Sequence, residues 1–431
     1  MKGFAGKILI IVQNLPVPLD RRVWLESRTL RDHGYKVSVI CPTSKEHPEK
    51  YQLVENIAIY RYDIPFEAKG FLSYFAEFLY AWFATACLSL RVLRREGFDV
   101  IQACNPPDTY FLLGWLYKVF GKKFIFDHHD LSPEMFLAKF PHRRGVLYRL
   151  LILLEKLTMK TADVVLVTNE SYRDIAISRG HKKRDDIYVV RTGPEFKQLA
   201  PVPAEPALKR GAEFLVCYLG EMCPQDGVDY LLRAAHYLRH QLGREDVRFV
   251  LIGGGPAVPD LQALNQRLKL TDKVEFTGRL PDADVSRYLS TADVCVDPDP
   301  YSEWADNSTM NKILEYMVFS KPIVAFDLKE IHNSARRAAL YARPNDISQF
   351  AQKIDHLLED AALRHRMGAY GHRRVVHELA WACTHTPLLA AYARLFNRSL
   401  QPPVEAEIDV KITRSLQQLQ LADKNLQPSL M

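Results

Sequence analysis

The sequence predicts an α/β protein with two Rossmann-like, doubly wound domains that face each other across a cleft. The chain has 431 residues, 48% of them apolar and 25% charged, which is typical of globular proteins and favours two domains over one. Short apolar runs alternate with helix-length segments along the chain. A segment rich in Pro and Ala interrupts this alternation once, near residue 200.

The first half of the chain contains six apolar runs of strand length. They cover residues 7–13, 36–42, 99–105, 122–130, 163–169 and 187–193. Apolar runs that are separated by helices indicate strands buried on both faces of a parallel sheet. We therefore predict a first domain over residues 1–200.

The second half repeats this pattern after the sequence APVPAEPAL, which is typical of a linker. Its strand-length runs cover residues 214–220, 247–255, 273–278, 293–298 and 321–326. They predict a second domain over 208–375, followed by a helical segment, 376–400, that packs back on the body. Residues 401–431 are polar and weakly patterned, so we expect a mobile tail. The cleft between the domains is the expected ligand site.

The cysteines and the apolar runs indicate in which cell compartment the protein works. The seven cysteines are widely spread without a CxxC pair, which indicates a reducing compartment and no disulfide or zinc framework. The apolar run 8–12 is too short for the core of a signal peptide.

In the apolar segment 71–95, only 13 uncharged residues separate Glu77 from Arg91, whereas a membrane span needs about 20. We expect a buried or membrane-resting helix there, in a cytoplasmic protein that is peripheral at the inner face of the cell membrane.

Positive charge is concentrated in the first half. Residues 1–200 hold 30 Lys and Arg against 22 Asp and Glu, whereas residues 201–431 hold 27 against 29. Basic clusters lie near the apolar helical stretches 71–90 and 146–157, a combination that fits an anionic membrane surface. Ordinary solvated Lys and Arg side chains explain the same pattern equally well.

An acid stands in the apolar stretch NSTMNKILEYMVFSKPIVAFD, residues 307–327. The apolar spacing predicts a helix with Asn311, Lys312 and Glu315 on its polar side. Three residues can cap the start of this helix: Asp306, Asn307 and Ser308. A nucleotide sugar fits this layout, because helix N–H groups suit its diphosphate and a carboxylate one turn deeper suits its ribose hydroxyls. The simpler alternative is that Glu315 pairs with Lys312 on a solvated helix face.

Seven motifs, in this order and spacing, are similar to those of a known family. They are PLDRRVWLESRTLRDHGYKVSVICP (18–42), CNPPDTYFLLG (104–114), FDHHDLSPE (126–134), GVDYLLRAA (227–235), VLIGGGP (250–256), VEFTGRLP (274–281) and NKILEYMVFSKPIVAFD (311–327). Through them the sequence resembles the family 4 retaining glycosyltransferases of GT-B fold, particularly those of bacterial surface-polysaccharide assembly. The similarity covers about residues 7–396.

The resemblance implies transfer of a sugar, with retention at the anomeric carbon, from a nucleotide sugar of UDP or GDP type. The acceptor would be a saccharide, or a saccharide linked to a polyprenyl diphosphate. The first domain would bind the acceptor and the second the donor. No cofactor, metal or nucleic acid is expected, since the prolines of DPDP (297–300) suit a turn although its acids have the spacing of a metal motif.

The resemblance also assigns residues to the donor. Glu315 matches the second acid of the family's paired-glutamate motif and would hold the ribose, while Asn307 stands in place of the first acid. The other donor-binding candidates are Lys312, Gly220, Arg279 and Leu280. Glu221 and Asp226 replace the family's diphosphate-binding Arg and Lys, so these side chains must turn away or other cations must compensate. We rank Lys312 first among those cations.

Candidates in the first domain follow two strands. By the resemblance, His129 is the catalytic residue at a strand tip and would hydrogen-bond the transferred sugar. Asp20, Arg21 and Arg22 are candidates for an acceptor phosphate or the donor diphosphate, because guanidinium groups suit phosphate oxygens. Capping of a helix that begins near Arg22 is their alternative role. The glycines of IGGGP (252–256) predict a sharp turn at the edge of the pocket.

Two other functions remain open. A sugar-nucleotide epimerase of the same fold would bind the same donor but would need acid and base residues that face C2 of the sugar. A non-catalytic partner of other assembly enzymes would explain the acids Glu221 and Asp226 at the expected diphosphate site. Donor turnover, donor isomerisation and binding without turnover would distinguish the three functions.

Overall fold

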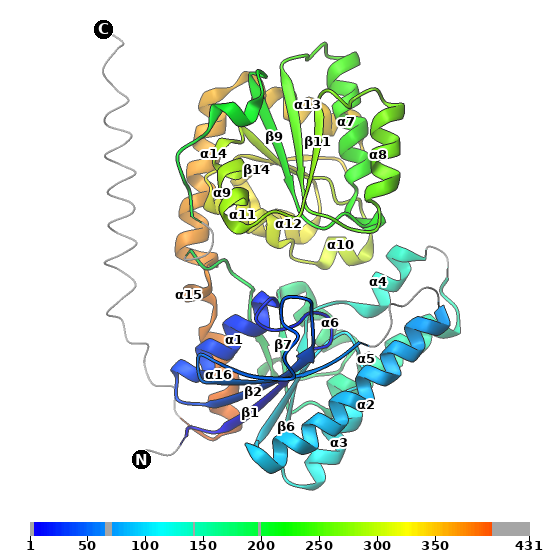
Figure 1. Cartoon of the computed structure of the whole chain (residues 1–431), viewed down its shortest axis with the longest axis vertical. Coiled ribbons are helices and arrows are strands. Elements are labelled where there is room, and N and C mark those ends of the chain that lie inside the picture. Colours follow the sequence, from blue (N-terminus) through cyan, green and yellow to red (C-terminus); the bar gives the residue numbers. More distant parts are fainter. Residues whose placement is uncertain (1–3, 65–70, 141–142, 197–199, 399–431) are drawn as a thin grey trace.

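The computed structural model of the chain describes residues 4–64, 71–140, 143–196 and 200–398, without the side chains of 71–75. Two α/β units, each organised around one sheet, face each other (Figure 1). The predicted fold class, two Rossmann-like domains with doubly wound sheets, is confirmed. The residues of the predicted tail, 401–431, lie outside the described residues.

The first sheet has eight strands in the order β3-β4-β2-β1-β5-β6-β7-β8. Neighbouring strands run parallel except in the antiparallel hairpin of β3 and β4. The strands are β1 (Lys7–Ile11), β2 (Lys36–Pro42), β3 (Tyr51–Val54), β4 (Ile57–Tyr62), β5 (Val100–Cys104), β6 (Lys123–His128), β7 (Val164–Val167) and β8 (Ile187–Val189). Each of the six predicted runs contains a strand.

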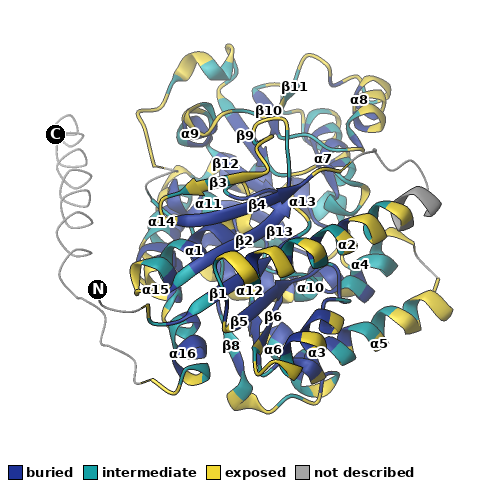
Figure 2. Ribbon diagram, turned by 60° about the horizontal axis from the view of Figure 1, so that its bottom comes forward, coloured by how far each residue is buried: buried dark blue, intermediate teal, exposed yellow. Residues whose placement is uncertain are grey.

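Helices connect the strands of the first sheet. They are α1 (Arg21–Asp32), α2 (Phe71–Arg95), α3 (Phe111–Val119), α4 (Ser132–Lys139), α5 (Val146–Thr161) and α6 (Glu170–Ser178), with the short turn η1 (Arg184–Asp186) before β8. Helix α2 packs against β1, β2 and β4. Within the described part of the chain, it is the one helix that is long and apolar enough to cross a membrane, over Ala76–Arg95. Only 22% of its most apolar stretch is buried inside the protein. Much of its outer side is exposed (Figure 2).

The second sheet has six parallel strands in the order β11-β10-β9-β12-β13-β14. They are β9 (Phe214–Leu219), β10 (Val247–Ile252), β11 (Val274–Gly278), β12 (Val294–Asp297), β13 (Ile323–Phe326) and β14 (Ala339–Ala342). Each of the five predicted runs contains a strand. Because all strands point the same way, their carboxyl ends lie at one edge of the sheet, which faces the first unit (Figure 1).

The helices of the second half follow the same alternation. They are α7 (Val228–His240), α8 (Val258–Arg267), α9 (Asp282–Thr291), α10 (Glu303–Asn307), α11 (Asn311–Val318), α12 (Lys329–Ala335), α13 (Ile347–Glu359), α14 (Ala361–Arg374), α15 (Trp381–Thr384) and α16 (Thr386–Leu395). The short helical turns are η2 (Pro206–Lys209), η3 (Pro224–Asp226), η4 (Arg336–Ala338) and the π-helix η5 (Val375–Leu379). Helix α16 packs against β7 and β8, so the chain returns to the first unit.

Three strands were not predicted. β3 and β4 form a hairpin whose turn residues, Glu55 and Asn56, both have positive φ. β3 exposes alternate side chains, so it lacks the continuous apolar run that identified the other strands. β14 has the sequence ALYA, and alanine is not a strand-favouring residue. Its pairing with β13 at the sheet edge therefore decides its conformation.

Two glycines bring the loops after β9 and β10 into contact. Gly253 has φ +133° and Gly255 has φ +150°, values that side chains rarely allow. A Cβ on Gly253 would lie 1.8 Å from the carbonyl oxygen of Gly220, and a Cβ on Gly255 would lie 2.5 Å from that of Met222. The sharp turn predicted from IGGGP is therefore a close backbone contact between two loops.

We predict that Gly253→Ala lowers the free energy of unfolding of the second unit by more than about 1 kcal/mol, because the conformation is strained and the methyl group meets backbone. Gly254→Ala is the matched control, since a Cβ there would have no atom within 4 Å. Its effect should stay within about 0.5 kcal/mol. Denaturant unfolding of both variants measures the difference, and equal midpoints would contradict the proposed contact.

Candidate functional site

A cleft of about 1280 Å³ lies between the two units and is lined by residues of both. Ligand pockets commonly measure about 300–1,000 Å³, so this space is large enough for a nucleotide sugar together with part of an acceptor. Eight of the ten predicted site residues line it: Asp20, Arg21, Arg22, His129, Gly220, Arg279, Leu280 and Glu315. Asn307 and Lys312 are not among its lining residues.

Loops of the second unit form one wall of the cleft. Gly220 follows β9, the turn of Gly253 to Gly255 follows β10, and Arg279 and Leu280 follow β11. The predicted position of the glycine turn at the pocket is confirmed. Since these loops all leave the carboxyl ends of parallel strands, the wall is the part of an open α/β sheet that usually binds ligands.

Glu315 lies on α11, one turn from its start, and is 15% exposed at the cleft. Its Oε1 atom accepts a hydrogen bond of 2.7 Å from Nη1 of Arg21, which belongs to α1 of the first unit. Arg21 also donates to Oδ1 of Asp282 at 3.3 Å. Burial raises the pKa of Glu315, and the charge of Arg21 opposes that rise. A ligand that binds this carboxylate must therefore share it with Arg21 or displace Arg21.

Lys312, ranked first among the cations for the diphosphate, is bound to other residues. Its ammonium lies 3.0 Å from Oδ1 of Asp297 and 2.9 Å from Oδ1 of Asp299, two fully buried carboxylates. It also lies 5.1 Å from the ring centroid of Tyr218. Lys312 therefore pairs with the two acids of the DPDP turn and not with Glu315, and it is not among the residues that line the cleft.

The start of α11 also differs from the prediction. Two helices, α10 and α11, replace the single helix, and Met310 stands at the N-cap of α11 without a side-chain cap bond. Asp306 instead accepts from the backbone N–H of Lys329 at 2.8 Å. The amide of Asn307 donates to the carbonyl of Glu303 at 2.7 Å. Asn307 thus ends α10 and is turned from the position where a donor hydroxyl was expected.

The two acids at the expected diphosphate site behave differently. Asp226 accepts from the backbone N–H of Cys223 at 2.7 Å, which folds its side chain into the turn η3. Burial raises the pKa of Asp226, and Lys312 opposes this. Glu221 is exposed and lines the cleft. Asp226 therefore turns away from the cleft, which is one of the two predicted alternatives, whereas Glu221 does not.

Arg279 is the cation of the second unit that remains available. It is exposed, lines the cleft beside the glycine turn, and forms no ion pair with any residue that the structure describes. Together with Arg21 it gives the cleft two guanidinium groups that a diphosphate can reach, because guanidinium geometry matches phosphate oxygens.

His129 lies directly after β6 and is 13% exposed. Its Nε2 atom lies 2.8 Å from Oδ2 of Asp127, a fully buried carboxylate at the end of the same strand. Burial lowers the pKa of His129, but the carboxylate of Asp127 outweighs this effect and brings the pKa above its usual value. The backbone N–H of His129 donates to Oδ1 of Asn105 at 2.6 Å, which fixes the loop.

Arg22 has a different role from the predicted phosphate contact. It is 6% exposed, and Nη2 lies 2.7 Å from Oδ1 of Asp127. Its Nη1 atom donates to the carbonyl of Val190 at 2.6 Å and to the hydroxyl of Thr192 at 3.1 Å. Because all these partners are protein groups, Arg22 holds the buried Asp127 in place, although the edge of its side chain reaches the cleft.

Asp20 performs the alternative role that the sequence allowed. It is the N-cap of α1 and accepts from the backbone N–H of Val23 at 3.0 Å. An aspartate at this position satisfies one of the free N–H groups of the first turn. Of the three predicted residues after β1, only Arg21 therefore presents a charged group to the second unit.

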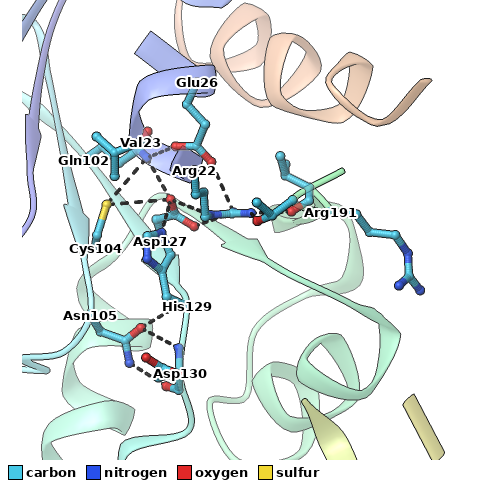
Figure 3. A network of polar contacts seen from close by, with 12 residues as sticks. Arg22, Val23, Glu26, Gln102, Cys104, Asn105, Asp127, His129, Asp130 and Arg191 are labelled. Atoms are coloured by element: carbon cyan, nitrogen blue, oxygen red, sulfur yellow. Dashed lines mark hydrogen bonds and ion pairs between the residues drawn. The ribbon is translucent and has the colours of Figure 1, made fainter. Parts of the chain in front are cut away.

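Asp127 is the centre of a buried polar network that joins α1, β5 and β6 (Figure 3). Gln102 donates from Nε2 to Oδ2 of Asp127 at 2.9 Å and to Oε2 of Glu26 at 2.7 Å. Burial, followed by the charge of Asp127, raises the pKa of Glu26 to about 8. Burial also opposes ionisation of Asp127, but Arg22 and His129 together outweigh it and lower the pKa of Asp127. The network thus favours one charged carboxylate, Asp127.

One group of three potential metal ligands occurs among the described residues: Cys104, Asp127 and His129. Their ligand atoms lie within 4.8 Å of one another. However, the guanidinium of Arg22 already binds Asp127, and a positive group there opposes a second cation. These residues therefore fit a hydrogen-bonded cluster better than a metal centre.

Polar contacts across the cleft hold the two units together beside the site. The amide of Asn169, at the start of α6, donates to the carbonyl of Asn307 at 2.9 Å and to the hydroxyl of Thr309 at 3.0 Å. The hydroxyls of Tyr172 and Ser308 lie 2.9 Å apart. These contacts fix the segment before α11 from the side of the first unit.

Sequence reasoning missed Asp127 and Gln102, which support His129, and Asp282, which binds Arg21. A polar residue inside an otherwise apolar strand was an available signal for Gln102 in VIQAC and for Asp127 in KFIFDHHD, because buried polar groups need partners. Nothing in the sequence marks Asp282, since its contact with Arg21 exists only when the units face each other.

Family models match both units. The model described as Glycosyltransferase Family 4 matches residues 19–195, and the model described as Glycosyl transferases group 1 matches residues 213–360. The alpha-D-kanosaminyltransferase of Streptomyces kanamyceticus is 32% identical over 155 residues, which span 36% of this chain and 38% of that protein. The 2-deoxystreptamine glucosyltransferase of the same organism is 23% identical over 297 residues, 65% of this chain and 74% of that protein.

Solved structures share the fold over nearly the whole chain. Sucrose-phosphate synthase of Thermosynechococcus elongatus has a TM-score of 0.74 at 19% identity and covers 91% of this chain and 100% of its own. HepE of Anabaena in complex with UDP has a TM-score of 0.65 at 15% identity, with 90% and 100% covered. With the two facing sheets and the family models of both units, these similarities show that the chain belongs to the family 4 glycosyltransferases of GT-B fold.

Proposed function

We propose that the protein transfers a sugar, with retention and without a metal ion, from a UDP- or GDP-type nucleotide sugar to a saccharide acceptor in polysaccharide assembly. The position of Glu315 carries this proposal, since it lies on the cleft wall one turn into α11, beside the loops after β9, β10 and β11. A carboxylate there suits the two ribose hydroxyls of a nucleotide. The solved complexes of HepE with UDP and UDP-glucose support a donor of this class.

The reaction requires stabilisation of the departing nucleoside diphosphate. In this proposal Arg279, which lines the cleft, would stabilise the developing negative charge, and Arg21 would swing to the same space when ribose takes Glu315. The departing phosphate would accept the proton of the acceptor hydroxyl. Glu221 opposes the charge of the diphosphate, so we expect donor affinity to depend strongly on the two arginines.

We predict that UDP or GDP raises the thermal midpoint of the wild-type protein by about 5 °C or more at a hundredfold excess over Kd, and that Glu315→Ala loses this response. Loss of the ribose contact is the physical reason. Differential scanning fluorimetry with both nucleotides and their sugars measures the effect. Glu213→Ala, at an exposed glutamate outside the cleft, is the matched control and should respond as the wild type does.

Turnover assays separate this function from the alternatives. Release of nucleoside diphosphate only in the presence of a saccharide acceptor supports transfer, whereas an isomerised donor would favour an epimerase. Binding of a nucleotide without turnover would favour the non-catalytic partner, as would a wild-type protein that ignores all nucleotides at millimolar concentration. In that case the exposed carboxylate of Glu221 has closed the diphosphate site.

We further infer that the acceptor is linked to a lipid of polyprenyl-diphosphate type and is met at the cytoplasmic side of an anionic membrane. The support is an outer helical face, which we define as the exposed side chains of α2, of α3 with its C-cap Phe120, and of α5. Helix α3 packs against α5, and the hydroxyl of Tyr117 on α3 lies 2.7 Å from that of Ser89 on α2, so the three helices form one layer.

The outer helical face combines apolar and basic side chains. Its exposed apolar residues are Leu79, Tyr80, Phe83, Leu90, Leu112, Trp115, Leu116, Val119, Phe120, Val146, Leu147, Leu150 and Leu153. Its exposed cations are Arg91, Arg94, Arg95, Arg149, Lys156 and Lys160. Within the described side chains of these helices, the acids Glu77 and Glu155 are not exposed. Apolar insertion and attraction to anionic lipid would therefore act together.

We predict that the wild-type protein binds vesicles of phosphatidylglycerol and phosphatidylcholine at low salt, and binds pure phosphatidylcholine vesicles much less. Trp115→Ser combined with Phe120→Ser should weaken binding at least about tenfold, because two exposed aromatic side chains no longer enter the bilayer. Sedimentation with vesicles measures both. Tyr301→Ser, at an aromatic of the second unit that is 53% exposed, is the matched control. Absence of binding to anionic vesicles at low salt would refute this role.

A further inference from the structure

The hydrogen bonds around Asp127 continue beyond the three elements that carry it. Gln102 donates both to Asp127 and to Glu26, and its Oε1 atom accepts a bond of 2.5 Å from the hydroxyl of Tyr392. Tyr392 belongs to α16, near the C-terminal end of the described chain, and is fully buried. Hydrogen bonds from Tyr392 to Gln102, from Gln102 to Asp127 and between Asp127 and His129 therefore connect α16 to the wall of the cleft.

Each bond in this chain orients the next group. The carboxylates of Glu26 and Asp127 both accept from the amide nitrogen of Gln102, and the hydroxyl of Tyr392 donates to its amide oxygen. Only one orientation of the amide therefore satisfies all three partners. Arg22 holds the other oxygen of Asp127 at 2.7 Å. Asp127 is thereby fixed on both sides, and Oδ2 points at Nε2 of His129.

We propose that Asp127, Gln102 and Tyr392 are positioning residues for His129, so that a residue of α16 completes the first-unit half of the candidate site. Asp127 accepts the proton of Nε2, which leaves Nδ1 as the free nitrogen of a ring that lines the cleft. The tautomer and orientation of His129 then depend on a hydroxyl group 263 residues further along the chain. This inference rests on the proposed function only where it concerns sugar transfer.

Charge in the network favours the same arrangement. Burial raises the pKa of Glu26, whereas Arg22 and His129 together outweigh burial and hold the pKa of Asp127 low, so the negative charge lies on the carboxylate that touches His129. The ionisable groups that face His129 are Asp20, Arg22 and Glu26 from the start of α1 and its cap, Cys104 from β5, Asp127 from β6 and Asp130 from the following loop. Among the acids of this set, only Asp127 bonds to the imidazole.

We predict that Asp127→Asn lowers the pKa of His129 by about one unit or more, because the ring loses its bonded anion. Glu26→Gln is the matched control: it makes the same change of carboxyl to amide, on the same Gln102, at the group that does not touch His129. It should shift the pKa by less than about 0.3 units. NMR titration of 15N-labelled histidine, assigned by difference with His129→Gln, measures both in the absence of any substrate. Equal shifts in the two variants would overturn the role of Asp127.

We predict that Tyr392→Phe raises the population of the Nδ1–H tautomer of neutral His129, since the amide of Gln102 loses the donor that fixes it. Tyr35→Phe is the control, because the ring of Tyr35 packs on Tyr392 with centroids 5.7 Å apart but does not bond to Gln102. The 15N shifts of the imidazole report the tautomer directly. An unchanged tautomer in folded Tyr392→Phe would overturn the link to α16.

Kinetics then test whether this positioning serves transfer. With an active donor and acceptor pair, Asp127→Asn should lower kcat about tenfold to a hundredfold while KM for the donor changes less than about threefold. A wild-type protein without transferase activity would refute the proposed function and leave the NMR result standing. A normal kcat in Asp127→Asn would instead show that the network does not position a reacting group.

Discussion

The buried carboxylate of Asp127 is the group on which the first-unit half of the site depends. A buried charge is costly unless it is paired and hydrogen-bonded, and Asp127 receives bonds from Arg22, Gln102 and His129. These residues come from α1, β5 and the loop after β6, so one carboxylate fixes three elements at the cleft. Arg22, which resembles a phosphate ligand in sequence, is committed to this task.

In the second unit, the central buried ion is a cation, Lys312. Lys312 lies between Asp297 and Asp299, and the helix that carries it also carries Glu315. Replacing Lys312 would leave two buried acids without their partner, so its loss would disturb α11 and the donor wall together. With Arg22 and Lys312 both occupied, Arg279 lines the described cleft without an ion pair to a described residue, whereas Arg21 must leave Glu315 and Asp282 to meet a diphosphate.

The strands and their order of appearance could be predicted because each is a short apolar run buried on both faces, and this pattern depends only on neighbouring residues. β3 and β14 lack that pattern, since they lie at the edges of their sheets, whereas β4 is buried throughout although Arg61 interrupts its apolar run. For the site, the apolar spacing placed Glu315 on the polar side of a helix and His129 at the end of a strand, and the family resemblance then assigned both residues to the donor. The partners of Arg22 could not, because they lie up to 170 residues away in the chain. Those of Lys312 lie only 13 and 15 residues away, but α10 separates them from α11, so their contact depends on how these elements pack.

The sequence by itself determined the two α/β units, the cleft and the presence of an acid and a histidine on its walls, since hydrophobic periodicity and motif order are local properties of the chain. Only the tertiary structure decided which charges face the cleft. Arg21 and Arg22 are adjacent in sequence, yet Arg21 reaches across to Glu315 while Arg22 is buried against Asp127. The physical reason is that ionised side chains take the nearest partner in space, and folding alone decides which partner that is.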